Sequence, residues 1–182
     1  MKIAIIGAGN LGLSIAKGLI INNTYTDLYL TKRNLDTIRE FEEYKSVFLT
    51  TNNNEAIKNA DILIFAVQPS QFESILNEVK PHLNEKHVII STITGFPISR
   101  IETQISSDYP IIRAMPNTAI SVAKSMTCLC SNQEGESKLP IAEAIFNGLG
   151  TNLIIEEELM QAATVLCASG IAFWMRLIRA TT

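Results

Sequence analysis

Apolar positions in this chain fall into short continuous runs and longer stretches with an apolar residue every three or four positions. The short runs predict strands at residues 2–6, 27–31, 47–49, 61–67, 88–92, 111–114, 126–129 and 152–155. Those at 61–67 and 88–92 are typical of strands buried inside a sheet. Helical periodicity is present at residues 11–21, 35–44, 71–79, 97–105 and 141–146. Strands separated by helices of this length predict βαβ units and an α/β fold with a doubly wound sheet.

The pattern changes at residue 156. Glu156, Glu157 and Glu158 are typical of a helix start, because acidic groups complement the positive helix N-terminus. Residues 159–178 are apolar on several faces, and a helix of that kind needs partners to cover it. We therefore expect a first domain over residues 1–155. Over residues 156–182 we expect the first helix of a helical domain that is otherwise missing or supplied by a partner.

The first strand runs directly into residues 7–12, which read Gly-Ala-Gly-Asn-Leu-Gly, and a helix pattern follows at once. In such a turn the first glycine allows a tight bend, the second lets backbone approach a pyrophosphate, and the third lets helix and strand pack closely. The helix N-terminus adds unpaired N–H groups and a partial positive charge. Glycines also mark ordinary turns. The position of these glycines between strand and helix favours a dinucleotide site.

The end of the second strand bears on the choice of cofactor. An NAD site usually carries Asp or Glu there, to bind the ribose 2′-hydroxyl, but this chain has Thr31, Lys32 and Arg33. Lys32 would attract a 2′-phosphate and the planar guanidinium of Arg33 would clamp it, whereas a carboxylate would repel it. Both cations could instead be ordinary solvated loop residues. We favour NADP over NAD.

Composition narrows the remaining possibilities. The formal net charge is −3, which gives no basic footprint for nucleic acid. No apolar run is expected to reach the roughly 20 residues that span a membrane, and the N-terminus lacks a secretory pattern. Cys128, Cys130 and Cys167 lack metal-ligand spacing, so we expect reduced thiols, no metal site and a cytoplasmic protein. His82 and His87 are expected at the surface without a role.

Other strand ends supply further candidates, since ligands in an open α/β sheet lie beyond the carboxyl ends of its strands. Pro69 and Pro116 end their strands, Gly95 allows close backbone approach, and Asn117 offers a donor and an acceptor near the expected nicotinamide. Each is a routine turn by itself. On one sheet edge they form a plausible cofactor wall.

Together, the glycine turn, Ala-Val-Gln-Pro at residues 66–69, Arg-Ala-Met-Pro-Asn-Thr at 113–118 and Thr-Val-Leu-Cys-Ala-Ser-Gly at 164–170 resemble the pyrroline-5-carboxylate reductase family. The resemblance covers essentially the whole chain, and Met-Pro-Asn-Thr is its most specific part. It implies a Rossmann domain followed by a helical domain through which the chain forms a homodimer or a higher homo-oligomer. It also implies NADPH-dependent reduction of Δ1-pyrroline-5-carboxylate to L-proline.

The resemblance and the motifs assign residues to two groups. The cofactor group is Gly7, Ala8, Gly9, Asn10, Leu11, Gly12, Thr31, Lys32, Arg33, Asn53, Ala66, Val67, Gln68, Pro69, Thr94, Gly95, Met115, Pro116 and Asn117. The substrate group, which the resemblance places at the substrate carboxylate, is Thr164, Ser169 and Gly170.

The chain departs from the family pattern in several places. Gln68 stands where the family has lysine, and Ser125 where it has glycine. In the last motif Cys167, Ala168 and Ile171 replace serine, glycine and proline, which changes backbone freedom in the substrate pocket. Two other functions therefore stay open: another NADP-linked reductase of an imine or small carbonyl, and an NADP-binding protein without catalysis. The family's chain also continues for about another helical domain.

Overall fold

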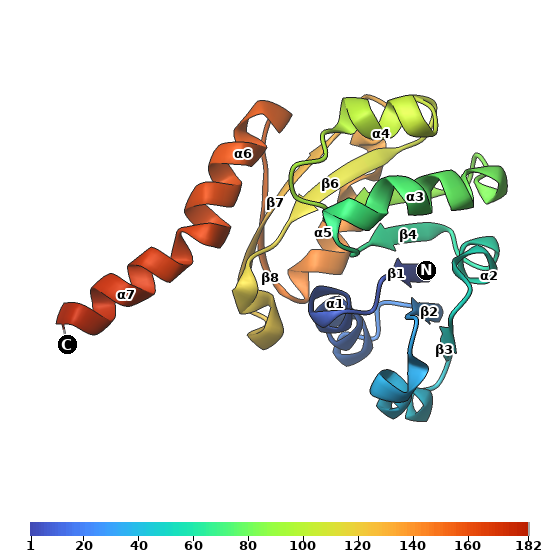
Figure 1. Cartoon of the computed structure of the whole chain (residues 1–182), viewed down its shortest axis with the longest axis horizontal. Coiled ribbons are helices and arrows are strands. Elements are labelled where there is room, and N and C mark those ends of the chain that lie inside the picture. Colours follow the sequence, from blue (N-terminus) through green and yellow to red (C-terminus); the bar gives the residue numbers. More distant parts are fainter. Residues whose placement is uncertain (182) are drawn as a thin grey trace.

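A single mixed sheet forms the centre of the fold in the computed structural model, which describes residues 1–181 (Figure 1). The strands are β1 (Lys2–Ile6), β2 (Asp27–Thr31), β3 (Val47–Thr50), β4 (Ile62–Phe65), β5 (Val88–Ser91), β6 (Ile111–Met115), β7 (Ser125–Ser131) and β8 (Gly150–Ile154). Their spatial order is β3-β2-β1-β4-β5-β6-β7-β8. The order reverses between β1 and β4, the point at which doubly wound sheets bind dinucleotides.

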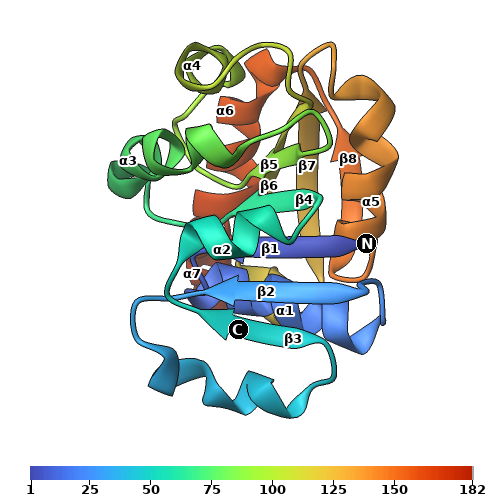
Figure 2. The same ribbon diagram turned by 90° about the vertical axis from the view of Figure 1, so that its right-hand side faces the viewer.

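Helices cover both faces of this sheet. The α-helices are α1 (Asn10–Ile21), α2 (Asn53–Lys58), α3 (Pro69–Val79), α4 (Ile98–Gln104), α5 (Leu139–Asn147), α6 (Met160–Ala163) and α7 (Ile171–Thr181). Short 3₁₀ segments are η1 (Leu35–Glu43), η2 (Lys80–His82), η3 (Thr118–Val122), η4 (Glu136–Lys138) and η5 (Glu157–Leu159), and η6 (Thr164–Ser169) is π-helical. Figure 2 shows α3 and α4 on one side of the strands and α5 on the other.

Alternation along the strands builds two hydrophobic cores. On β1, Ile3 and Ile5 belong to the core under α1, η1 and α5, while Ala4 and Ile6 belong to the core under α2, α3 and α4. All four side chains are fully buried. Because both faces of the strand are covered, its sequence reads as a continuous apolar run rather than an alternating one. The predicted doubly wound α/β fold is confirmed.

Three local features were not predicted from the sequence. β7 is antiparallel to β6, because residues 116–124 are too short for the crossover helix that a parallel return needs. The expected amphipathic helix at 35–44 is the 3₁₀ segment η1, whose inward residues Leu35, Ile38 and Phe41 are spaced by three, the period of that helix. The short α2 was not predicted from the sequence.

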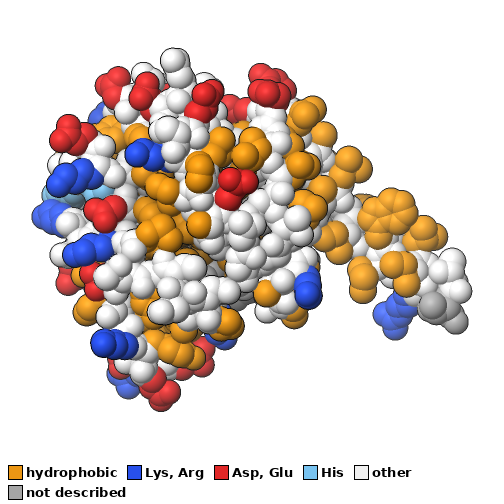
Figure 3. Space-filling model, turned by 180° about the vertical axis from the view of Figure 1, so that it is seen from behind, with side chains coloured by type: hydrophobic (Ala, Val, Ile, Leu, Met, Phe, Trp, Pro, Cys, Tyr) orange, Lys and Arg blue, Asp and Glu red, His pale blue; other side chains and the backbone are white. Residues whose placement is uncertain are grey.

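The last helical stretch leaves the body of the protein. Residues Glu157–Thr181 form one helical segment of 25 residues that is long and apolar enough to cross a membrane by length and composition. The expectation that no segment reaches this length is therefore wrong. Length and composition are weak evidence alone, because core helices of non-membrane proteins pass the same test. Figure 3 shows this segment projecting from the body with hydrophobic side chains on its surface.

His87 corrects a second expectation, because it is 1% exposed rather than at the surface. Its Nδ1 accepts a hydrogen bond from the Asn84 N–H at 3.1 Å, so Nε2, 3.2 Å from the Ile57 carbonyl oxygen, carries the proton. Burial lowers the pKa of His87 from its ordinary value of 6.5, outweighing the backbone contacts that raise it. His87 is thus a neutral side chain that joins the α2 region to the start of β5.

We expect acid to destabilise the fold through His87. The unfolded chain binds a proton at this side chain near pH 6.5, and the native state does so only at lower pH. Stability from the neutral imidazole is therefore fully present above pH 6.5 and is lost as the pH falls through the lowered native pKa. His87→Gln should flatten the fall in unfolding free energy below pH 6.5, measured by urea denaturation. An unchanged pH slope would contradict this assignment.

Candidate functional site

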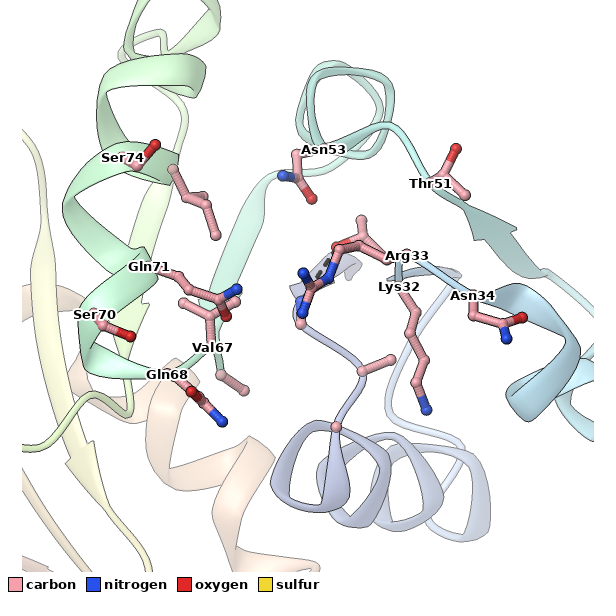
Figure 4. A pocket seen from close by; sticks show the side chains of 16 residues that line it. Lys32, Arg33, Asn34, Thr51, Asn53, Val67, Gln68, Ser70, Gln71 and Ser74 are labelled. Carbon is pink, nitrogen blue, oxygen red and sulfur yellow. Dashed lines mark hydrogen bonds between the residues drawn. The ribbon is translucent and has the colours of Figure 1, made fainter.

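A cavity of about 680 Å³ opens at the point where the strand order reverses. Its walls are the loops after β1, β2, β3 and β4, together with the first turns of α2 and α3 (Figure 4). The lining residues are Gly7, Ala8, Gly9, Thr31, Lys32, Arg33, Asn34, Thr51, Asn53, Ala66, Val67, Gln68, Ser70, Gln71, Ser74 and Ile75. Ten of the predicted cofactor residues meet here although they come from four separate segments.

The glycine turn has the shape that the sequence requires. Gly7 has φ of +99°, a conformation that favours glycine, and a Cβ there would overlap Val67 and the Ala66 carbonyl. A Cβ at Gly12 would overlap the Gly7 carbonyl oxygen, so this glycine lets α1 pack on the loop. Gly9 has no atom within 4 Å of the equivalent position. Its side therefore faces open space where a ligand can approach.

The N-terminus of α1 is free to bind an anion. Gly9 is the N-cap and gives no side-chain cap, and the first helical hydrogen bond runs from Leu13 N to the Gly9 carbonyl at 2.8 Å. Among residues 1–181, the N–H groups of residues 10–12 have no hydrogen-bond acceptor. Unpaired N–H groups and the helix dipole together favour a phosphate at this place.

The charge of the lining matches the prediction for the second strand end. Lys32 and Arg33 line the cavity, whereas no Asp or Glu does so among the described residues. Neither cation forms an ion pair within residues 1–181. Figure 4 shows the Arg33 guanidinium over the middle of the cavity, facing Asn53, while Lys32 runs along its wall. A phosphate on a ribose placed there would meet two cations and no carboxylate.

Thr31 lines the cavity and also supports the glycine turn. It is 2% exposed, its hydroxyl accepts from the Gly7 N–H at 3.2 Å, and its carbonyl accepts from the Ala8 N–H at 2.7 Å. These bonds fix the glycine turn against the end of β2. Sequence reasoning also missed Asn34, Thr51 and three polar residues on α3 that line the cavity: Ser70, Gln71 and Ser74. Ser70 and Ser74, four residues apart in the helix sequence, were the available signal.

The remaining predicted residues lie farther along the same sheet edge, around two other cavities. Thr94, Gly95 and Thr164 line one of about 680 Å³, between the end of β5 and α6. The other, of about 470 Å³, is lined by Asn10, Leu11, Pro116, Asn117 and Ser169 among others. The structure thus places Thr164 and Ser169 on different cavities.

Four predicted residues line none of these cavities. Met115 is 6% exposed and its sulfur accepts from the Thr94 hydroxyl at 3.8 Å. Pro69 begins α3, Gly12 packs within α1, and the Gly170 N–H donates to the Val165 carbonyl at 2.7 Å. These four residues therefore support neighbouring helices and strands and do not form part of a cavity surface.

Ser125 shows how one departure from the family pattern is accommodated. Its hydroxyl accepts from the Asn117 N–H at 3.1 Å and shares a hydrogen bond of 3.3 Å with Thr127. The Asn117 side chain in turn accepts from the Ala119 N–H at 3.0 Å and caps η3. Ser125 thereby holds the turn that places Asn117 on its cavity.

The substituted last motif forms the π-helical segment η6. The Thr164 hydroxyl donates to the Met160 carbonyl at 2.8 Å, inside its own helix. Cys167 contacts the buried Cys128, whose pKa is raised mainly by burial and further by this neighbour. On the same strand, burial and then the Glu157 carboxylate raise the pKa of Cys130 to about 12. Both strand thiols are therefore protonated at neutral pH.

A family model described as NADP oxidoreductase coenzyme F420-dependent matches residues 2–95. Pyrroline-5-carboxylate reductase 2 of Dictyostelium discoideum is 38% identical, an alignment covering 98% of this chain and 66% of the relative. Pyrroline-5-carboxylate reductase 1 of the same organism is 40% identical and covers 98% of this chain and 35% of the relative. The chain thus spans about one third to two thirds of these relatives.

The solved structures similar to this chain include further pyrroline-5-carboxylate reductases. A pyrroline-5-carboxylate reductase from Coxiella burnetii superposes with a TM-score of 0.92 at 30% identity, covering 98% of this chain and 68% of that chain. The Plasmodium falciparum pyrroline carboxylate reductase, solved with NADP bound, has a TM-score of 0.85 at 26% identity, covering 99% and 67%. These alignments extend through the projecting helix, which therefore has a counterpart in those structures.

Alanine substitutions at Gly9 and Gly12 should have different effects on stability, because only Gly12 is needed for packing. Gly12→Ala forces the new Cβ into the Gly7 carbonyl and should lower the unfolding free energy by about 1–3 kcal/mol. Gly9→Ala places its Cβ in open space and should change that energy by no more than about 1 kcal/mol. Urea denaturation measures both. Equal destabilisation would refute the reading of Gly9 as a ligand-facing position.

Proposed function

We propose that this chain, which belongs to the pyrroline-5-carboxylate reductase family, binds NADPH and reduces the cyclic imine Δ1-pyrroline-5-carboxylate to L-proline. The observation that carries the proposal is the cavity at the reversal of strand order. There the uncapped α1 N-terminus faces two unpaired cations and no carboxylate. This combination fits a dinucleotide with an additional phosphate.

NADPH fits the cavity better than NADH for an electrostatic reason. Only NADPH carries the 2′-phosphate, and Lys32 and Arg33 are the charged residues of the lining. Arg33 can form two parallel hydrogen bonds to a phosphate, whereas Lys32 acts as a point charge. The P. falciparum relative, solved with NADP, supports this choice. Asn53, on the first turn of α2, reaches the same cavity and is a candidate for the adenosine ribose.

The reaction asks for positioning more than for acid–base chemistry. Bound NADPH would supply the hydride, and a protonated imine is already electrophilic. The chain's task is then to bind both molecules with the reacting carbons within roughly 3–3.5 Å. Thr94, Gly95 and Asn117 stand on the sheet edge toward which a nicotinamide extends from the first cavity. Thr164, Ser169 and Gly170 are our candidates for the substrate carboxylate.

The same proposal includes a domain division and a partner. We assign residues 1–155 to cofactor binding and 156–182 to the start of a helical domain for substrate binding and dimerisation. Val165, Leu166, Phe173, Trp174 and Met175 are between 58% and 75% exposed, which supports burial against a second copy. A cytoplasmic location is supported by the three free cysteines.

A second candidate is NADP binding without turnover of this imine. It is favoured by the separation of Thr164 and Ser169 onto different cavities and by the substituted last motif. A related possibility is another imine or small carbonyl as substrate. NADPH oxidation with different imines and small carbonyls distinguishes these candidates.

Removing the Arg33 side chain should weaken NADPH and spare NADH. A charge-assisted hydrogen bond is worth about 1.5–3 kcal/mol, so Arg33→Ala should raise the NADPH Kd by about 10- to 150-fold. Arg39→Ala is the matched control, because Arg39 pairs with Asp36 on exposed η1 and does not line the cavity. Fluorescence titration measures both cofactors. Equal loss of NADPH and NADH affinity would contradict the assignment of Arg33 to the 2′-phosphate.

The reaction itself is tested by NADPH oxidation with Δ1-pyrroline-5-carboxylate, run on fractions from gel filtration. We expect turnover to L-proline in the fractions that contain two or more copies, because the exposed helical segment then becomes covered. NADPH binding with this imine inert and another imine reduced would favour the alternative reductase. NADPH binding with all imines and small carbonyls inert would favour the non-catalytic function.

A further inference from the structure

Arg113 is an unusual residue for its position. It lies in the middle of β6, a strand whose five residues are all buried, and is itself 7% exposed. In the sheet it pairs with Ser91 on one side and Cys130 on the other. A guanidinium at such a place is costly unless a charged partner compensates for its lost hydration. The partner must come from outside the sheet.

Glu157 is that partner. Its Oε1 accepts from Arg113 Nη1 at 2.8 Å, and the same oxygen accepts from the Ile98 N–H at 2.8 Å. Ile98 begins α4 and Glu157 begins η5, so one carboxylate oxygen joins a central strand, a covering helix and the C-terminal helical segment. The Arg113 side chain is 8% exposed and that of Glu157 29%, which limits screening by solvent.

The bond lies where the C-terminal segment leaves the body. Ile155 N still donates to the Leu129 carbonyl at 2.9 Å, and Met160 is 1% exposed in the core under α4. Beyond Ala163, which packs at the margin of that core, the helix is largely exposed. The ion pair, Met160, Ala163 and the contact of Cys167 with Cys128 are thus among the attachments of this helix to the body.

The Arg113–Glu157 pair also borders the cavity between the end of β5 and α6. Arg113 and Glu157 line it together with Thr94 and Gly95 on one side and Thr164 on the other. A shift of η5 and α6 would therefore change the distance between the cofactor side and the substrate side of this cavity.

We propose that Arg113 and Glu157 are positioning residues: their ion pair, with its bond to the Ile98 N–H, holds the helix that carries the substrate side against the cofactor edge. The inference rests on the proposed function for its effect on the substrate. Its effect on the helix is independent of any activity. Neither side chain is assigned contact with the reacting atoms.

The test compares Glu157→Gln, the double variant Arg113→Met/Glu157→Leu and the control Glu156→Gln. Glu156 is the exposed glutamate next in sequence and does not line the cavity. The double variant leaves no unpaired buried charge and can retain a folded core. Hydrogen exchange over residues 155–163 reports helix docking, and steady-state kinetics report the KM for the imine beside the Kd for NADPH.

We expect exchange over residues 155–163 to be about tenfold or more faster in the double variant and a few-fold faster in Glu157→Gln, with Glu156→Gln like the wild type. The imine KM should rise by about tenfold, with NADPH Kd within about twofold of the wild type. Wild-type exchange and KM in the double variant would overturn the proposal, and so would wild-type values in Glu157→Gln if the double variant fails to fold. If the wild type reduces no imine, the proposed function fails and exchange alone decides the role of the pair.

Discussion

The close approach of α1 to the loop after β1 is the constraint on which the cofactor cavity depends. Gly12 lies so near the Gly7 carbonyl that no side chain fits, and Thr31 holds the loop through its hydroxyl and its carbonyl. These contacts place Gly9, the N-cap of α1, on the cavity that the loops after β2 and β4 enclose. A bulkier residue at position 12 would move the helix and with it the anion site. The close contact between the Gly7 carbonyl and Gly12 thus determines where an anion can bind.

Much of the fold and of the cofactor cavity could be predicted because the signals are local. Gly7, with φ of +99°, and Gly12, which has no space for a Cβ, are positions where the structure requires glycine, so the sequence shows them directly. Strands buried on both faces leave continuous apolar runs. The charge of the loop after β2 can be identified from the sequence, since Lys32 and Arg33 lie where a carboxylate is otherwise expected. In each case one segment of chain contains both the cause and its signal.

The features that sequence reasoning missed depend on partners far along the chain. Arg113 meets Glu157 at a separation of 44 residues, and His87 meets Ile57 at 30. Nothing beside Glu157 in the sequence distinguishes it from Glu156 or Glu158, so all three fit a simple helix start. The direction of β7 follows from the length of a loop rather than from apolar periodicity. The split of Thr164 and Ser169 onto two cavities likewise depends on distant residues, Thr94 and Gly95 at one cavity and Asn10 and Leu11 at the other.

The proposed cofactor side and the proposed substrate side lie on parts of the chain that are attached to the sheet in different ways. In the proposed function, cofactor recognition is built from the backbone and the loop cations among residues 7–75 that line the first cavity. The proposed substrate side rests on a helix that the half-buried Glu157 carboxylate, Met160 and the contact of Cys167 with Cys128 attach to that sheet. Substitutions such as Cys167 and Ile171 can therefore alter the substrate side while leaving the cofactor cavity intact. A change of imine specificity within this fold would require no change in cofactor recognition.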